Sequence, residues 1–148
     1  MMFPLQVVYS FDKKVKTVSD ITTGRTFQQA LRWVERNVWY KSDFKKWRRS
    51  DYWQTPEETL TKDSSFGERT GDCEDYAILC RAILKEYEIP SQVLRINGVT
   101  NRHVAGHAVC IFEHTQRWWY IDNGVLLQSS FQTKDKLIEY IKSQFGEF

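Results

Sequence analysis

Cys73 lies between two acidic residues, Asp72 and Glu74, in the stretch GDCEDYAILC that spans residues 71–80. A thiolate is the nucleophilic form of cysteine, and nearby carboxylates disfavour it. If Asp72 caps a helix, however, Cys73 is its first residue, where backbone N–H groups and the helix dipole lower a thiol pKa. The acids then stabilise the helix end, and a histidine is still required as a cationic partner. We therefore predict that Cys73 is a nucleophile paired with a histidine.

Three histidines compete for this role. His103 lies in the polar run NGVTNRH and His114 in a presumed hairpin loop, whereas His107 begins a predicted strand. A rigid strand can aim a catalytic base, so we choose His107. Asp122 ends the next predicted strand and can orient the imidazole ring, which gives a nucleophile, a base and an orienting group.

The elements that must position these residues are predicted as helices first and strands later. Capping residues open helices over 26–40, 55–60 and 73–88, the last capped by Asp72 and ended by Pro90. Residues 91–96, 106–112 and 117–122 are rich in β-branched or aromatic residues, with a hairpin loop at 113–116, and residues 133–145 have the spacing of a closing helix. This order predicts an α+β fold in which the central helix packs on an antiparallel sheet.

Length and composition are those of one soluble domain. The chain has 148 residues, 41% hydrophobic and 27% charged, so we expect a single domain over 1–148, with residues 1–25 as an unassigned N-terminal extension. No apolar run approaches the roughly 20 residues that span a bilayer, and no signal peptide is recognisable. Three cysteines, an odd number, do not form a disulfide framework. We therefore expect no membrane partner and a cytoplasmic location.

Five ordered blocks resemble one known family. DYWQTPEETL, GDCEDYAILC, IPSQVLRI, GHAVCIF and WWYIDN are similar to the pattern of bacterial transglutaminase-like cysteine proteinases, a branch of the papain-like transglutaminase superfamily. The resemblance covers about residues 32–123 and places the family's catalytic residues on Cys73, His107 and Asp122. It implies a papain-like fold and a cysteine peptidase that acts on carboxamides of protein or peptide substrates through a thioester.

The same resemblance implies further site residues. An aromatic residue before the nucleophile often helps to hold the oxyanion in the superfamily, and Trp53 is the candidate. No cofactor is required, although some members bind calcium through acids that correspond to Asp72 and Glu74, and carboxylates suit calcium. The chain departs from the pattern in lacking an export signal, in the extra residues TKDSSFGERT, and in residues 1–25, which match nothing in it.

Several alternatives remain open. The same triad would serve a protein-glutamine transglutaminase or a deamidase. A non-catalytic domain could bind peptides, or nucleic acid through the basic and aromatic stretch KKWRRSDYW at 45–53, although a net charge of only +2 argues against nucleic acid. A zinc site would draw on Cys73, Cys80, His103 and His107 but lacks a CxxC pair. Cys80 and Cys110 fall among apolar residues, so we expect both in the core.

Overall fold

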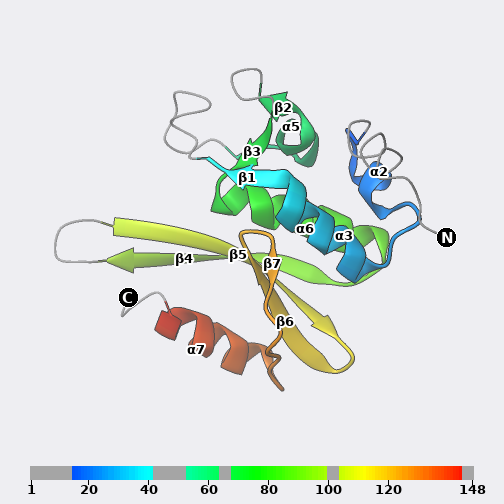
Figure 1. The fold of residues 1–148 in the computed structure, drawn as a ribbon. Helices are drawn as coiled ribbons and strands as arrows, with labels where there is room; N and C mark the ends of the chain where they lie inside the picture. The colour runs from blue at the N-terminus through cyan, green and yellow to red at the C-terminus, as the bar shows by residue number, and fades with distance from the viewer. Residues whose placement is uncertain (1–14, 42–52, 64–67, 100–103, 145–148) are drawn as a thin grey trace.

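A central helix, α6 (Cys73–Glu86), lies between two sheets in the computed structural model (Figure 1). The structure describes residues 15–41, 53–63, 68–99 and 104–144. On one side of α6 is a three-stranded sheet in the order β1-β3-β2, and on the other a four-stranded sheet in the order β4-β5-β6-β7. The predicted α+β architecture, with the central helix packed on an antiparallel sheet, is confirmed.

The other described helices and strands have the following bounds, in their order along the chain. The other helices are α2 (Val18–Thr22), α3 (Phe27–Asn37), α5 (Pro56–Leu60) and α7 (Lys134–Gln144). The strands are β1 (Val38–Tyr40), β2 (Lys62–Asp63), β3 (Glu68–Gly71), β4 (Ser91–Val99), β5 (Val104–His114), β6 (Arg117–Asp122) and β7 (Val125–Leu126). In the described part of the chain, every helix is too short or too polar to cross a bilayer.

The N-terminal half contains both confirmed and corrected predictions. Thr26 and Thr55 cap α3 and α5 through capping boxes with Gln29 and Glu58, as their spacing predicts. The predicted helix over 26–40 is too long, however, because Val38–Tyr40 leave the helix and pair in parallel with β3. Residues 15–25 also belong to the fold, since α2 buries Val18 and Ile21 in the core.

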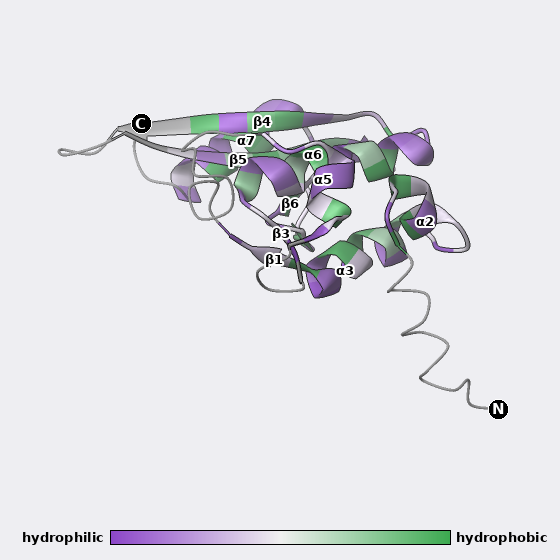
Figure 2. Cartoon of the chain, turned by 90° about the horizontal axis from the view of Figure 1, so that it is seen from above, coloured by the Kyte–Doolittle hydropathy of each residue, from purple (hydrophilic) through white to green (hydrophobic). Residues whose placement is uncertain are grey.

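The four-stranded sheet has one apolar face toward α6 and the other toward α7. Successive residues of a strand point to opposite faces, so Ala108, Cys110 and Phe112 of β5 join the core around α6. Val109 and Ile111 join a second cluster with Leu137 and Ile141 of α7. Figure 2, which is coloured by hydropathy, shows that the helices also carry both apolar and polar residues. Strand β5 is therefore the shared centre of both layers.

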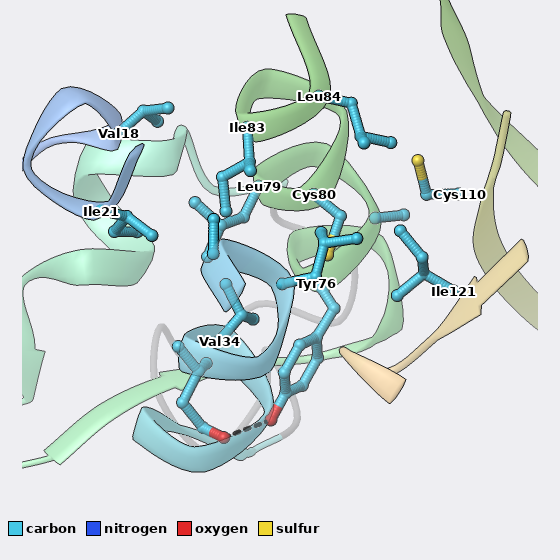
Figure 3. Close-up of a cluster of buried hydrophobic side chains, with 14 of the residues drawn as sticks. Val18, Ile21, Val34, Tyr76, Leu79, Cys80, Ile83, Leu84, Cys110 and Ile121 are labelled. Atoms are coloured by element: carbon cyan, nitrogen blue, oxygen red, sulfur yellow. Dashed lines mark hydrogen bonds between the residues drawn. The ribbon is translucent and has the colours of Figure 1, made fainter. Parts of the chain in front are cut away.

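Buried cysteines occupy the core positions that the sequence predicts. Cys80 of α6 and Cys110 of β5 are fully buried, and both are free thiols. They lie with Leu84 and Ile121 in the cluster drawn in Figure 3. The β5–β6 loop is shorter than predicted, because Glu113 and His114 continue the strand and only Thr115 and Gln116 form the turn.

Candidate active site

Cys73 is the first residue of α6, as predicted. The Asp72 carboxylate caps the helix by accepting the backbone N–H of Asp75 at 3.3 Å, and the Asp75 carboxylate accepts the N–H of Asp72 at 3.0 Å. Two N–H groups that the helix start would otherwise leave unpaired are thus satisfied. The side chain of Cys73 lies at the positive end of α6 and is 8% exposed.

The surroundings of the thiol favour its protonated form. The Cys73 S–H donates to Oε2 of Glu74 at 3.3 Å. Burial, followed by the charge of the Glu74 carboxylate, raises the pKa of Cys73 to about 12, although a hydrogen bond with the backbone of Ala108 lowers it. This direction is opposite to the depressed pKa expected from the helix position. The main cause is burial of the thiol, and Glu74 adds to it by turning toward the sulfur instead of only stabilising the helix end.

His107 and Asp122 form the pair that the sequence predicts. Nε2 of His107 in β5 lies 2.7 Å from Oδ1 of Asp122 at the end of β6, and both side chains are partly buried. An ionised carboxylate can only accept, so the Nε2–H of His107 donates. In a neutral imidazole, the lone pair then lies on Nδ1, which is the nitrogen that can take a proton from a thiol.

The backbone of β5 connects this pair to Cys73. The Ala108 backbone that contacts the sulfur belongs to the residue directly after His107. His114 lies at the other end of β5, where its ring centroid is 4.8 Å from that of Phe27. His103 is outside the described residues. The choice of His107 therefore remains a prediction that the position of β5 favours.

Arg95 is a site residue that sequence reasoning did not find. It lies on β4 directly opposite Ala108, and its Nη1 is 3.8 Å from Oε1 of Glu74. Its guanidinium carbon also lies 5.8 Å from the ring centroid of Trp53, which is 46% exposed. Arg95 thus contacts both Trp53 and Glu74, and the role of Trp53 in holding an oxyanion stays a prediction. A basic residue inside the otherwise apolar run VLRI was the only signal for Arg95.

A buried carboxylate fixes the segment that carries Trp53. Asp75 is fully buried, and its carboxylate accepts the backbone N–H of Gln54 at 2.8 Å and the Gln54 side-chain N–H at 2.7 Å. Gln54 also donates to the carbonyl of Thr70 at 3.1 Å. Gly71 allows this close packing, because a Cβ there would lie 2.8 Å from Cβ of Asp75. The sequence showed Asp75 only as a residue suited to the helix end.

Asp72 and Glu74 supply oxygen donors of the kind that calcium prefers. The charges of both carboxylates raise the pKa of Cys73, and Oε2 of Glu74 lies 3.3 Å from its sulfur. Calcium takes six to eight oxygen ligands, so two carboxylates would need backbone carbonyls or water as further ligands. Within the described ranges, no three or more His, Cys, Asp or Glu side chains are grouped to hold a metal ion. The basic residues of KKWRRSDYW lie outside these ranges.

Comparison with known proteins identifies one family. Residues 8–146 match the family model described as bacterial transglutaminase-like cysteine proteinase. No curated protein matches the chain. One solved structure matched by the comparison is described as a crystal structure of a TGase, with a TM-score of 0.41 and 14% sequence identity. The match covers 97% of this chain and 35% of that one, so the chain spans about a third of its length.

Proposed function

The chain belongs to the bacterial transglutaminase-like cysteine proteinase family, and from this premise we propose that it is a cysteine peptidase that hydrolyses carboxamides in proteins or peptides. The observation that carries the proposal is the 2.7 Å contact between Nε2 of His107 and Oδ1 of Asp122. The residue after His107 on β5 is Ala108, whose backbone contacts the Cys73 sulfur. A base held by a carboxylate beside a helix-end thiol can form and resolve a thioester.

Each residue of the triad has a defined part in this reaction. Nδ1 of His107 takes the thiol proton, and Sγ of Cys73 attacks the substrate carbonyl carbon to give a tetrahedral intermediate. The protonated His107 then gives that proton to the leaving amine, and Asp122 keeps the ring oriented throughout. Water, activated by the same histidine, hydrolyses the thioester and restores the thiol.

The developing oxyanion requires hydrogen-bond donors near the sulfur. The backbone N–H of Cys73 is one candidate, because the first N–H groups of a helix have no partner within the helix. The indole N–H of Trp53 is the second candidate that we propose, supported by the attachment of Gln54 to Asp75 in the first turn of α6. Two such donors would stabilise the transition state more than the substrate.

We also propose that Asp72 and Glu74 are calcium ligands. The support is the chemistry of the two carboxylates, whose repulsion with each other and with a thiolate would fall when a cation binds. Bound calcium would supply positive charge beside Cys73. The chain's own contribution is to hold both carboxylates at the start of α6, Asp72 as the cap through its hydrogen bond and Glu74 in the first turn near Arg95.

The three free cysteines support a reducing location. All three are buried and unpaired with one another, which suits a compartment where thiols stay reduced. We propose the cytoplasm, and fractionation of the host cell with an antibody to the chain would test this. Recovery from the cell envelope would contradict the proposal.

The activity is tested in a lysate of the host cell supplied with a labelled primary amine. Wild-type protein is compared with Cys73→Ala and with Cys80→Ala, which removes a buried thiol away from the proposed site. We expect shorter fragments without label from the wild type and Cys80→Ala, and none from Cys73→Ala. Cysteine-dependent labelling of glutamines in uncut proteins would instead identify a transglutaminase. No difference between wild type and Cys73→Ala would contradict any activity at this thiol.

A further inference from the structure

The hairpin turn after Asp122 has a geometry that only a few residue types adopt. Asp122 of β6 pairs with Val125 of β7, so Asn123 and Gly124 alone form the loop. Their φ angles are +47° and +84°, the left-handed conformation that both residues of a tight hairpin turn need. Asparagine and glycine tolerate this conformation best. The turn therefore places Asp122 at a defined position relative to β7.

The tip of this turn packs against α6, the helix that carries Cys73. A Cβ added to Gly124 would lie 3.2 Å from two ring carbons of Tyr76 and 3.4 Å from a methyl carbon of Val34. Tyr76 lies one turn after Cys73, is 4% exposed, and donates its hydroxyl to the carbonyl of Val38 at 2.7 Å (Figure 3). The ring is thus held by the helix at one end and by β1 at the other.

From these contacts we propose that the Asn123–Gly124 turn is a positioning device, which holds Asp122 against His107 by docking on the Tyr76 ring. The inference rests on the proposed function, because it assigns to the turn a role in the same triad. Since the ring is fixed at both ends, a larger residue at 124 must move the turn rather than the ring. Movement of the turn shifts Asp122, which is two residues away, and this changes the position of the His107 imidazole that Asp122 holds.

The role belongs to the backbone of the turn and not to the side chain of Asn123. Oδ1 of Asn123 is buried and has no hydrogen-bond partner among the described residues. Asn123→Gly keeps the left-handed conformation, whereas Asn123→Val opposes it. Glycine at 123 should therefore preserve the triad, and valine should disturb it.

The test measures the rate constant for alkylation of Cys73 by iodoacetamide, followed by peptide mass mapping, together with the melting temperature. The matched control for Gly124→Ala is Gly24→Ala, because Gly24 has a φ of +76° and no atom within 4 Å of an added Cβ. Both variants carry the same backbone strain, but only Gly124→Ala presses on Tyr76. Asp122→Ala and the double variant Asp122→Ala with Gly124→Ala complete a mutant cycle.

We expect Gly124→Ala to slow alkylation by about tenfold, since a misplacement of about 1 Å can cost on the order of a hundredfold. Gly24→Ala and Asn123→Gly should react at nearly the wild-type rate, and Asn123→Val should be slowed. Because the turn acts through Asp122, Gly124→Ala should add no further loss when Asp122 is already alanine. That non-additivity would not arise from a general loss of stability.

Different results overturn different claims. If Asp122→Ala slows alkylation but Gly124→Ala behaves like Gly24→Ala, the positioning role is wrong and the triad stands. Full additivity in the mutant cycle would also refute action through Asp122. Equal losses in Asn123→Gly and Asn123→Val would assign the effect to the side chain and contradict the inference. An unchanged rate in Asp122→Ala would overturn the triad itself, and the positioning role with it.

Discussion

The sulfur of Cys73 is subject to opposing influences at the scale of single residues. Burial and Glu74 raise its pKa, and the Ala108 backbone lowers it. The sequence predicted the capping role of Asp72 because that role depends on residues three positions apart. It did not predict that Glu74 would accept the Cys73 S–H, because a side-chain rotamer at a buried site depends on neighbours such as Arg95, which arrives from a distant strand.

Glu74→Gln tests both influences at this site. Removing the carboxylate charge should lower the pKa of Cys73, so alkylation by iodoacetamide near pH 7 should become several-fold faster than in the wild type. The same change should reduce any rise in melting temperature caused by millimolar calcium, since calcium stabilises only through its ligands. Glu57→Gln, on the exposed start of α5, is the matched control and should leave both quantities unchanged.

Two results would contradict these expectations separately. An unchanged alkylation rate in Glu74→Gln would show that burial alone sets the pKa of Cys73. An absence of any calcium-dependent shift in wild-type protein would leave Asp72 and Glu74 with only their roles at the helix end.

At the scale of elements, local patterns predicted where α3, α5, α6 and α7 start, but not α2, and long-range pairing decided where α3 ends. Of the four capping boxes in the described chain, those at Thr26, Thr55 and Asp72 begin where their spacing indicates, and the one at Thr17 was not predicted. The predicted end of α3, at residue 40, was wrong because Val38–Tyr40 gain backbone partners in β3, about 30 residues later. Helical periodicity in one segment carries no information about such a partner, and propensity is readily overridden by tertiary contacts.

The link between Gln54 and Asp75 gives an element-scale prediction. Gln54→Ala removes two donations from a buried amide, one of them to the Asp75 carboxylate. We expect a loss of about 2–3 kcal/mol in the free energy of unfolding, because hydrogen bonds to charged groups contribute roughly 1.5–3 kcal/mol. Gln128→Ala, at an exposed position, is the control and should change the free energy by less than about 0.5 kcal/mol. Equal effects in urea unfolding would refute an anchoring role for Gln54.

At the scale of the whole molecule, β5 joins the two apolar clusters and also carries His107. One face of β5 packs on α6 and the other on the cluster that includes α7, so the strand cannot shift without disturbing both. The sequence predicted the packing of the central helix on the sheet from the succession of helices and strands, but not the place of α7 on the other face. It did not predict the second sheet, because β2 and β3 are short and lie in the stretch 61–71, which lacks a clear period.

The buried thiols of the shared core should lower the free energy of unfolding as the pH becomes alkaline. Burial raises the pKa of Cys80 well above its ordinary range and that of Cys110 to about 12. In the unfolded chain both thiols ionise above about pH 8.5. Above that pH the unfolded state binds fewer protons than the folded state, so the free energy of unfolding must fall as pH rises. Below it both states are protonated, and this contribution is constant.

The expected size follows from the linkage relation. Each pH unit above the ordinary thiol pKa should remove up to about 1.4 kcal/mol per buried thiol. Urea unfolding between about pH 8 and 10.5 should therefore show a steeper decline for the wild type than for Cys80→Ala with Cys110→Ala, which has neither thiol. The double variant starts from a lower stability because it loses buried sulfur atoms, so the comparison uses the slope with pH and not the absolute value. Parallel slopes would mean that these thiols ionise as readily in the folded core as in the unfolded chain.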